Sequence, residues 1–364
     1  MTAAHIIAAR RSAVVPRGGA FAGLSIEALG APVIAALLQD AGLEPGHVDE
    51  VILSNALGAG GNPARRVALL AGLPQRVAGV SIDRQCAGGL DALVLAQAMV
   101  LSGQAEAVIA GGVESYSQRP IRQMPGAAAP YDEAPFTPWP DRDPGMAEAA
   151  AALAGRLGLT RVAMDAWAVD SHRKACAAAE ELQAEIVALA GVARDAFTRR
   201  LTPHLAARAP GVTGPITAAN AAVAADGAAL VLVVSDRIAA KAGRALRIAG
   251  GATRGGLPWE PGLAPVAAIA QVLTRAGLAP DALAQSEVME AYAVQAIACV
   301  RGAGLDPARV NLRGGALARG HPVGASGAIL AVRLFHDLTR AGHPGPGLAA
   351  IAAAGGIGTA LLLA

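Results

Sequence analysis

The sequence predicts an α/β protein built from two repeated βαβ halves with an insertion between them. Three observations indicate this class: strand-like and helix-like patterns alternate, one order of elements occurs twice, and a loop-rich stretch separates the copies. The chain has 364 residues, which is too long for one average core and suits two compact halves.

The repeat begins with two similar amphipathic helices, predicted at 31–41 and 264–276. Each ends in Ala-Gly-Leu, whose glycine suits the left-handed conformation that closes a helix. A short apolar run follows each helix, at 50–53 in the first copy and at 287–290 in the second. These pairs predict the same helix-turn-strand unit twice.

The repeat continues with a strand and a glycine-rich turn, after which a helix follows. These strands are predicted at 80–83 and 310–312, and each half closes on a strand ending in paired glycines, at 107–112 and 348–356. Chance similarity between alanine-rich helices is the weaker explanation, because the elements recur in one order. We therefore expect a mostly parallel sheet in each half, with the helices of the two halves buried against each other.

Residues 118–212 interrupt the repeat and are predicted to form an inserted loop domain. The stretch 118–140 is rich in Pro, Asp and Gly, whereas 147–189 has a helical pattern. Long insertions usually cover an active site or bind substrate. The predicted division is 1–117 with 213–242 as the N-terminal half, 118–212 as the insertion, and 243–364 as the C-terminal half.

Composition excludes several classes of protein. With 30 Lys and Arg against 28 Asp and Glu and no dense basic run, nucleic-acid binding is not expected. Charged residues, Gly or Pro interrupt every alanine-rich run, so no membrane span is predicted. The three cysteines form no CxxC pair or disulfide framework, and the N-terminus lacks the order of a secretion signal. We expect a cytoplasmic protein without a metal site.

Cys86 is the first candidate catalytic residue. It directly follows the predicted strand at 80–83 and opens a helix through Cys-Ala-Gly-Gly. A thiol at a helix N-terminus feels the positive end of the helix dipole and unpaired N–H groups, and both favour the nucleophilic thiolate. We therefore expect an accessible thiol of low pKa. A small cysteine buried in a turn fits the local sequence equally well.

His321 is the second candidate. It lies between Gly320 and Pro322 in the glycine-rich loop 314–327, so the backbone rather than helix packing holds it. That placement suits a general base beside a thiol. Taken alone, a His-Pro pair is more typical of a solvent-exposed turn.

Several segments together resemble the thiolases. They are the Cys86 segment, the Gly-Gly-Val-Glu-Ser-Tyr-Ser of 111–117, the loop 314–327, the tail 354–361, and the shorter matches 61–65 and 220–228. These matches fall in order and span nearly the whole chain. The long Gly-His-Pro loop is the most specific of them.

The resemblance implies a thiolase fold, with two βαβ halves in a five-layer α/β/α/β/α arrangement and a loop domain that binds CoA. It implies that Cys86 takes an acyl group from CoA and that His321 activates Cys86 and helps hold the thioester oxygen. The backbone N–H groups of Cys86 and Ala354 would form the oxyanion hole. Acyl-CoA is then a substrate rather than a permanently bound cofactor, no cofactor-binding side chain is predicted, and a homodimer or homotetramer forms through the N-terminal half.

Four positions depart from the thiolase pattern. The second cysteine, which moves the α-proton in Claisen chemistry, is Ala352, and the asparagine that orients a water in the enolate's oxyanion hole is Met289. A histidine is replaced by Gly145 and a CoA-contacting serine by Gly250. Loss of one oxyanion donor is worth ~10²–10³ in rate and loss of a general base about 10²–10⁴. Carbon–carbon chemistry is therefore expected to be weakened, whereas acyl transfer to Cys86 is not.

Three functions follow from this reading. The first is a thiolase-like acyltransferase with weakened or altered Claisen chemistry, in which Glu290 is a candidate replacement base although the family's glutamate here looks structural. The second is an acyl-CoA hydrolase, or acyl transfer to a non-carbon nucleophile. The third is a non-catalytic thiolase-fold subunit that binds CoA or an active partner. We favour the first.

Overall fold

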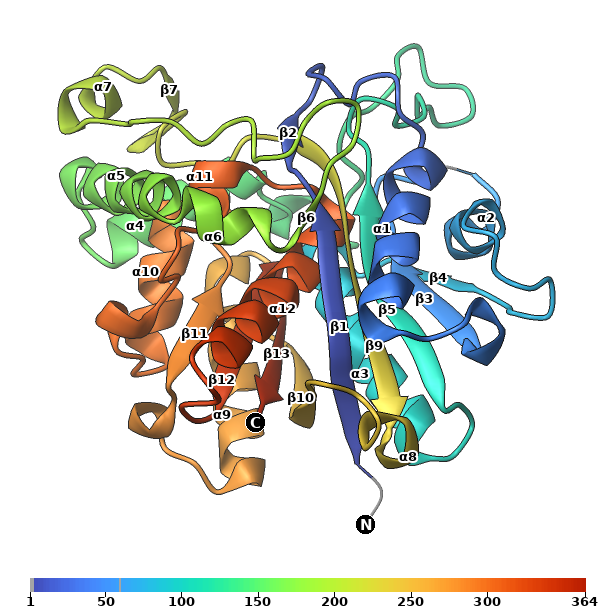
Figure 1. The fold of residues 1–364 in the computed structure, drawn as a ribbon. Helices are drawn as coiled ribbons and strands as arrows, with labels where there is room; N and C mark the ends of the chain where they lie inside the picture. Colours follow the sequence, from blue (N-terminus) through green and yellow to red (C-terminus); the bar gives the residue numbers. More distant parts are fainter. Residues whose placement is uncertain (1–2, 59) are drawn as a thin grey trace.

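The computed structural model describes residues 3–58 and 60–364, so that residues 1, 2 and 59 of the predicted N-terminal half lie outside the described residues. Its strands form one large sheet in the order β11-β12-β13-β10-β1-β9-β5-β3-β4 (Figure 1). The N-terminal strands are β1 (Ala4–Ser12), β3 (Glu50–Ser54), β4 (Val80–Ile82), β5 (Ala107–Glu114) and β9 (Ala225–Ser235). The C-terminal strands are β10 (Leu246–Gly255), β11 (Gln285–Val288), β12 (Gly347–Ala353) and β13 (Ile357–Leu363).

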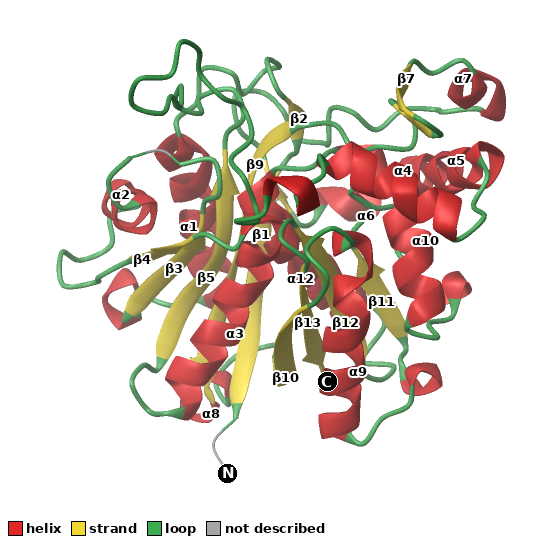
Figure 2. Cartoon of the chain, turned by 180° about the vertical axis from the view of Figure 1, so that it is seen from behind, coloured by secondary structure: helices red, strands yellow, loops and turns green. Residues whose placement is uncertain are grey.

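The two halves meet where β1 pairs with β10. Among the described residues, two residue pairs make this junction, His5 with Arg247 and Ile6 with Leu246. Seen from behind, the strands of the two halves spread to either side of β1 (Figure 2). Each half therefore keeps its own sheet, joined to the other at one edge.

The prediction of mostly parallel sheets is wrong, because each half has a mixed sheet. β3 is parallel to β4 and β5, and β11 to β12, but β9, β10 and β13 are antiparallel to their neighbours. A tight turn joins β12 to β13, with Gly355 and Gly356 at φ 75° and 72°. A connection this short can link antiparallel strands only.

Helices complete the predicted five layers. Helices α3 (Gly88–Leu101) and α12 (Val323–Arg340) form the central layer between the two sheets. Helices α1 (Ile26–Ala41) and α2 (Pro63–Leu70) cover the outer face of the N-terminal sheet. Helices α9 (Ala264–Ala276) and α10 (Ala293–Gly302) cover the outer face of the C-terminal sheet.

The repeated helices end as predicted. Gly42 after α1 and Gly277 after α9 are left-handed, at φ 58° and 66°, and each donates its N–H to a carbonyl of the last turn. The prediction of a strand at 310–312 is wrong, since of these three residues only Val310 makes a β-bridge, which pairs it with Ser286. Asn311 explains this: its side chain accepts from the N–H of Val288 at 2.8 Å and donates to the carbonyl of Val288 at 2.9 Å.

The helices of the inserted region lie over the C-terminal half (Figure 1). The region contains α4 (Met146–Arg156), α5 (Arg161–Ala177), α6 (Ala179–Gln183) and α7 (Pro203–Ala207), and it packs against α10 and α11 (Ala316–Arg319). β6 (Ile186–Val187) pairs with β1, while β7 (Gly211–Thr213) and β8 (Ile216–Thr217) form a hairpin across the predicted boundary at 212. The remaining elements are β2 (Val15–Pro16) and α8 (Asp236–Ala239). The domain boundaries stay predictions.

Within the described part of the chain, no helix combines the length and the apolar character needed to cross a membrane.

Candidate active site

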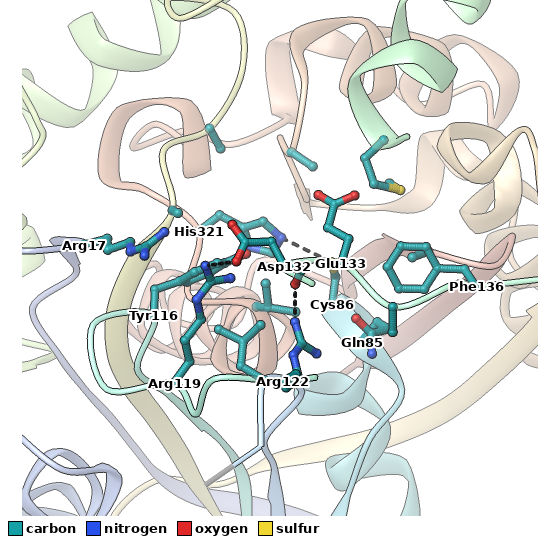
Figure 3. A pocket seen from close by; sticks show the side chains of 18 of the residues that line it. Arg17, Gln85, Cys86, Tyr116, Arg119, Arg122, Asp132, Glu133, Phe136 and His321 are labelled. Atoms are coloured by element: carbon teal, nitrogen blue, oxygen red, sulfur yellow. Dashed lines mark hydrogen bonds and ion pairs between the residues drawn. The ribbon is translucent and has the colours of Figure 1, made fainter. Parts of the chain in front are cut away.

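A cavity of about 340 Å³ lies where the ends of the two central helices meet the inserted region. Cys86 and His321 line it, and Figure 3 shows both side chains facing the same space. The other walls come from the loop 116–136 and from the starts of α4 and α10, and they carry Tyr116, Arg119, Arg122, Asp132, Glu133, Phe136, Met146 and Tyr292.

Cys86 sits in a tight turn between β4 and α3. The preceding Gln85 has φ 48°, a left-handed conformation that a side chain rarely adopts, and its N–H donates to Asp83 Oδ1 at 2.8 Å. The regular helix begins at Gly88, two residues later than the sequence predicts. This turn leaves Cys86 half-buried at the cavity floor.

Glycines on α3 and β5 allow the start of α12 to approach closely enough to pair Cys86 with His321. A Cβ on Gly89 of α3 would lie 2.7 Å from the carbonyl oxygen of Gly324, and a Cβ on Gly112 of β5 would lie 1.9 Å from it. No larger residue fits at either position without moving the backbone. The glycine-rich sequences around the two candidates therefore serve this contact.

His321 Nε2 lies 3.2 Å from Cys86 Sγ, so the predicted hydrogen-bond reach is met. The N–H of His321 donates to the carbonyl of Val223 at 2.8 Å, which fixes the loop in place. Its Nδ1 lies 2.6 Å from Ser326 Oγ, and that hydroxyl donates to the carbonyl of Pro322 at 2.9 Å. Because the single Ser326 proton is used, Nδ1 is the donor to Ser326, and Nε2 offers a lone pair to the thiol.

Burial sets the electrostatics of the pair. It raises the pKa of the Cys86 thiol to about 12, against the opposing effect of the backbone N–H groups of Cys86 and Ala354. The prediction of a low thiol pKa is therefore wrong, because desolvation outweighs the helix N-terminus. Burial, with help from Arg319, lowers the pKa of His321 to about 4. At neutral pH the pair is a thiol and a neutral imidazole.

The predicted oxyanion donors act on the electrostatics of Cys86. The backbone N–H groups of Cys86 and Ala354 lower the pKa of the thiol against the larger effect of burial, and Ala354 also lines the cavity. Two N–H groups converging beside a nucleophile are suited to hold a developing oxyanion.

Glu290 has a structural role, and its contacts argue against the suggestion that it replaces the missing base. Its carboxylate accepts from Trp167 Nε1 at 3.0 Å, from Ser171 Oγ at 2.7 Å and from Asn311 Nδ2 at 2.9 Å. It is buried, 1% exposed, and is not among the residues that line the cavity. These bonds fasten α5 to the C-terminal half.

The departing positions add no proton carrier to the cavity. Met289 is fully buried in the core between the sheets, and Ala352 is the last residue but one of β12, two residues before Ala354. Gly145 directly precedes Met146, and a Cβ on Gly250 would meet Val272 at 3.3 Å. Side chains at these four positions offer no group that could take up an α-proton.

Sequence reasoning missed Arg17, Arg119 and Glu133 of the cavity wall. They lie in irregular segments outside the motifs, and no periodicity marks them. Tyr116 was also missed. It lies two residues after Glu114, inside the segment 111–117 that resembles the thiolases, and that resemblance could have identified it. In the described ranges, no group of three or more His, Cys, Asp or Glu side chains is placed to hold a metal ion.

The layered fold and the cysteine–histidine pair define an α/β protein with a candidate cysteine nucleophile. Comparisons with known proteins give the family. The model of the thiolase N-terminal domain matches residues 4–237, and that of the thiolase C-terminal domain matches residues 244–364. The chain belongs to the thiolase family.

Named relatives cover the whole chain. A Bacillus subtilis (strain 168) protein, provisionally named acetyl-CoA C-acetyltransferase YhfS, is 40% identical over 99% of this chain and 98% of its own length. An acetyl-CoA acetyltransferase of Pseudomonas aeruginosa is 38% identical over 99% of this chain and 98% of its own. The crystal structure of the Bacillus anthracis acetyl-CoA acetyltransferase superposes with a TM-score of 0.92 at 32% identity, covering 100% of this chain and 98% of that one.

Proposed function

We propose that this protein is a thiolase-type acyltransferase that takes an acyl group from acyl-CoA onto Cys86, and that its carbon–carbon bond chemistry is weak. The observation that carries the proposal is the 3.2 Å separation of His321 Nε2 and Cys86 Sγ, with Nε2 as the acceptor. Relatives named acetyl-CoA acetyltransferases support a CoA thioester as the substrate.

Acyl transfer then follows from the neutral pair. His321 Nε2 takes the thiol proton as Cys86 Sγ attacks the thioester carbonyl carbon, and the N–H groups of Cys86 and Ala354 hold the oxyanion. The bond between that carbon and the CoA sulfur breaks. The proton passes from His321 to the CoA sulfur, which leaves as a free thiol, and the acyl group stays on Cys86.

The same site is poorly equipped for the second half of a thiolase reaction. Forming or breaking a carbon–carbon bond requires a group that moves the α-proton and a donor for the enolate oxygen. Ala352 has no ionisable group, and the buried thioether of Met289 is no donor. These two side chains support an enzyme whose acyl-enzyme forms readily and condenses slowly.

Mass spectrometry of the intact chain after incubation with a short acyl-CoA tests the proposal. We expect one acyl mass on Cys86, which Cys86→Ser abolishes and His321→Ala slows by about 10²–10⁴-fold. Cys176→Ser is the matched control, because Cys176 is the exposed cysteine of α5, and this variant should acylate normally.

Decay of the acyl-enzyme separates the remaining functions. Loss of the acyl group only when CoA or a second acyl-CoA is added indicates transfer, whereas equal loss in buffer alone indicates a hydrolase. A folded protein whose Cys86 takes no acyl group contradicts the proposal and favours a non-catalytic subunit.

A homodimer or homotetramer belongs to the same proposal. β4 lies at the open end of the sheet order, directly before Cys86, and Val80 in it is 44% exposed. Open strand edges of this kind are usually covered. A stable monomer in light scattering at micromolar concentration would argue against assembly through this edge.

A further inference from the structure

The cavity beside Cys86 is basic at one end. Arg17 and Arg119 lie together on the side of Cys86 away from Phe136 (Figure 3). Arg119 donates to Asp132 Oδ1 at 2.6 Å, and this ion pair neutralises its charge. Arg122 also lines the cavity, where its guanidinium is held by the backbone carbonyl of Asp132 and the ring of Tyr131. Arg17 is the third arginine of this cavity.

Arg17 is held in place by its backbone while its side chain is left open. The N–H of Arg17 donates to the carbonyl of Ala224 at 2.9 Å, and the next N–H, of Gly18, donates to Ser117 Oγ at 2.9 Å. Within residues 3–58 and 60–364, the guanidinium of Arg17 has no hydrogen bond or ion pair. A guanidinium with its donors free, facing a cavity, is suited to bind a carboxylate through two parallel bonds.

The wall of the same cavity also offers apolar contacts and a further hydrogen-bond donor. Leu57 and Val323 supply apolar lining, and Tyr116 adds a hydroxyl. Burial raises the pKa of Tyr116, so its hydroxyl stays a hydrogen-bond donor at neutral pH. An acyl chain attached at Cys86 would thus have apolar side chains and two kinds of donor within the same cavity.

Glu133 marks a different end of the cavity. Figure 3 shows it on the other side of Asp132 from Arg17, with its carboxylate turned away from the arginines. Its charge acts on Tyr292, which together with Met146 begins the helices α10 and α4 beside the inserted region. A carboxylate there suits the amide N–H groups of the CoA arm. The two ends therefore favour different parts of one substrate.

We infer that the acyl group carried by this enzyme ends in a negative charge: the preferred substrate is a CoA monothioester of a short dicarboxylic acid, whose free carboxylate binds Arg17 and Tyr116. The inference rests on the proposed function, since it places the thioester carbon at Cys86. It names the substrate class that the proposed function leaves open.

A matched pair of ligands tests the inference by binding as well as by reaction. Glutaryl-CoA and pentanoyl-CoA have chains of equal length that end in a carboxylate and a methyl group. Calorimetric titration of the full chain carrying Cys86→Ala, which cannot be acylated, should show glutaryl-CoA binding about 10-fold tighter, or more. Adding Arg17→Gln should bring the ratio of the two affinities close to one. Adding Arg301→Gln, at the exposed far end of α10, should leave the ratio unchanged.

The outcomes separate this inference from the proposed function. Equal affinities, or a preference that survives Arg17→Gln, would overturn the inference even if Cys86 of the unmodified chain is acylated by both compounds. A glutaryl preference that depends on Arg17, with no acyl mass on Cys86 of the unmodified chain, would uphold the inference and reject the acyl-enzyme. Because Arg17 is exposed, the preference should also weaken at high salt.

Discussion

Ser326 Oγ lies 2.6 Å from His321 Nδ1 while it donates its own proton to the carbonyl of Pro322. This arrangement makes Ser326 a positioning residue that selects the tautomer with Nε2 free to accept from Cys86. Ser326→Ala should slow acylation of Cys86 on the order of 10-fold, since the ring loses both its orientation and its tautomer preference. The rate of acyl-mass formation measures the effect.

Recovery with threonine distinguishes positioning from a general loss of packing. Ser326→Thr keeps the hydroxyl one turn after Pro322 and should restore most of the acylation rate. If the alanine and threonine variants were equally slow, or if alanine acted only by lowering the thermal midpoint, this role for Ser326 would be lost.

The pH dependence of Cys86 reactivity follows from the shifted pKa values. Because burial raises the pKa of Cys86 to about 12 and lowers that of His321 to about 4, no thiolate–imidazolium pair exists between these limits in the free protein. Alkylation of Cys86 by iodoacetamide should therefore rise about tenfold per pH unit from pH 6 to pH 9, with the thiolate fraction. Peptide mass spectrometry at each pH gives the rate. A plateau near neutral pH would show a stable ion pair instead.

Much of the fold was predictable because local patterns determine it. The αL glycines Gly42 and Gly277 and the repeated order of elements identify both halves, and the motifs identify Cys86 and His321. The loss of the strand at 310–312 was not predictable, since it depends on the side chain of Asn311 reaching back to β11.

The electrostatics of the site could not be predicted from the sequence for a similar reason. The helix N-terminus is a local feature, but the burial of Cys86 comes from His321, 235 residues away, and from the loop 116–136. Arg17 reaches the cavity only because β2 and β9 place its segment there. Contacts of this range leave no periodic trace in the sequence.

A buried carboxyl group should make stability depend on pH. Glu287 is 1% exposed, its Oε2 has no partner among the described residues, and Arg333, Asp337, Arg319 and Glu185 lie around it. Burial raises its pKa, so its contribution to stability is full below the unfolded value of about 4.5 and is lost as the pH rises through the folded value. The thermal midpoint of the parent protein should therefore fall between pH 5 and pH 9, and Glu287→Gln should flatten this fall. The corresponding difference in unfolding free energy should be about 1–3 kcal/mol.

The exposed Glu180→Gln provides the control for this measurement, because it removes the same charge from the surface of α6. It should leave the pH profile of the parent protein unchanged. Equal profiles for Glu287→Gln and the parent would mean that Glu287 does not titrate in this range.

Glu290 should affect stability and leave acylation intact. Glu290→Ala leaves the buried donors of Trp167, Ser171 and Asn311 without an acceptor, which should cost about 3 kcal/mol or more of unfolding free energy. Glu290→Gln retains an acceptor oxygen and should be milder. Denaturant unfolding measures stability, and the acyl mass on Cys86 at a temperature where each variant is folded measures reactivity. A stable Glu290→Gln protein that has lost acyl transfer would return Glu290 to the list of catalytic candidates.

Restoring the missing acid/base should recover thiolase chemistry. Ala352 is 6% exposed at the end of β12, and its chain continues directly to Ala354 in the cavity wall. A cysteine there adds one sulfur atom at the position where the thiolase pattern has the cysteine that moves the α-proton. Ala352→Cys should raise cleavage of a 3-oxoacyl-CoA by CoA by up to about 10²–10⁴-fold, the range for a positioned acid or base. The loss of the 3-oxoacyl-CoA absorbance follows the reaction.

Ala352→Ser separates chemistry from packing, because a hydroxyl fills nearly the same space but is a far weaker acid than a thiol and does not ionise at neutral pH. It should stay as slow as the parent protein.

Met289→Asn should help only in combination with Ala352→Cys, since an oxyanion donor has no enolate to hold until a base has formed one. The asparagine also replaces a fully buried methionine in the core, so the double variant should gain activity while losing some stability. Brisk cleavage by the unmodified protein would reject the proposal that its carbon–carbon chemistry is weak. It would require a proton carrier that neither Ala352 nor the fully bonded Glu290 supplies. Glu133 would then be the residue to replace first.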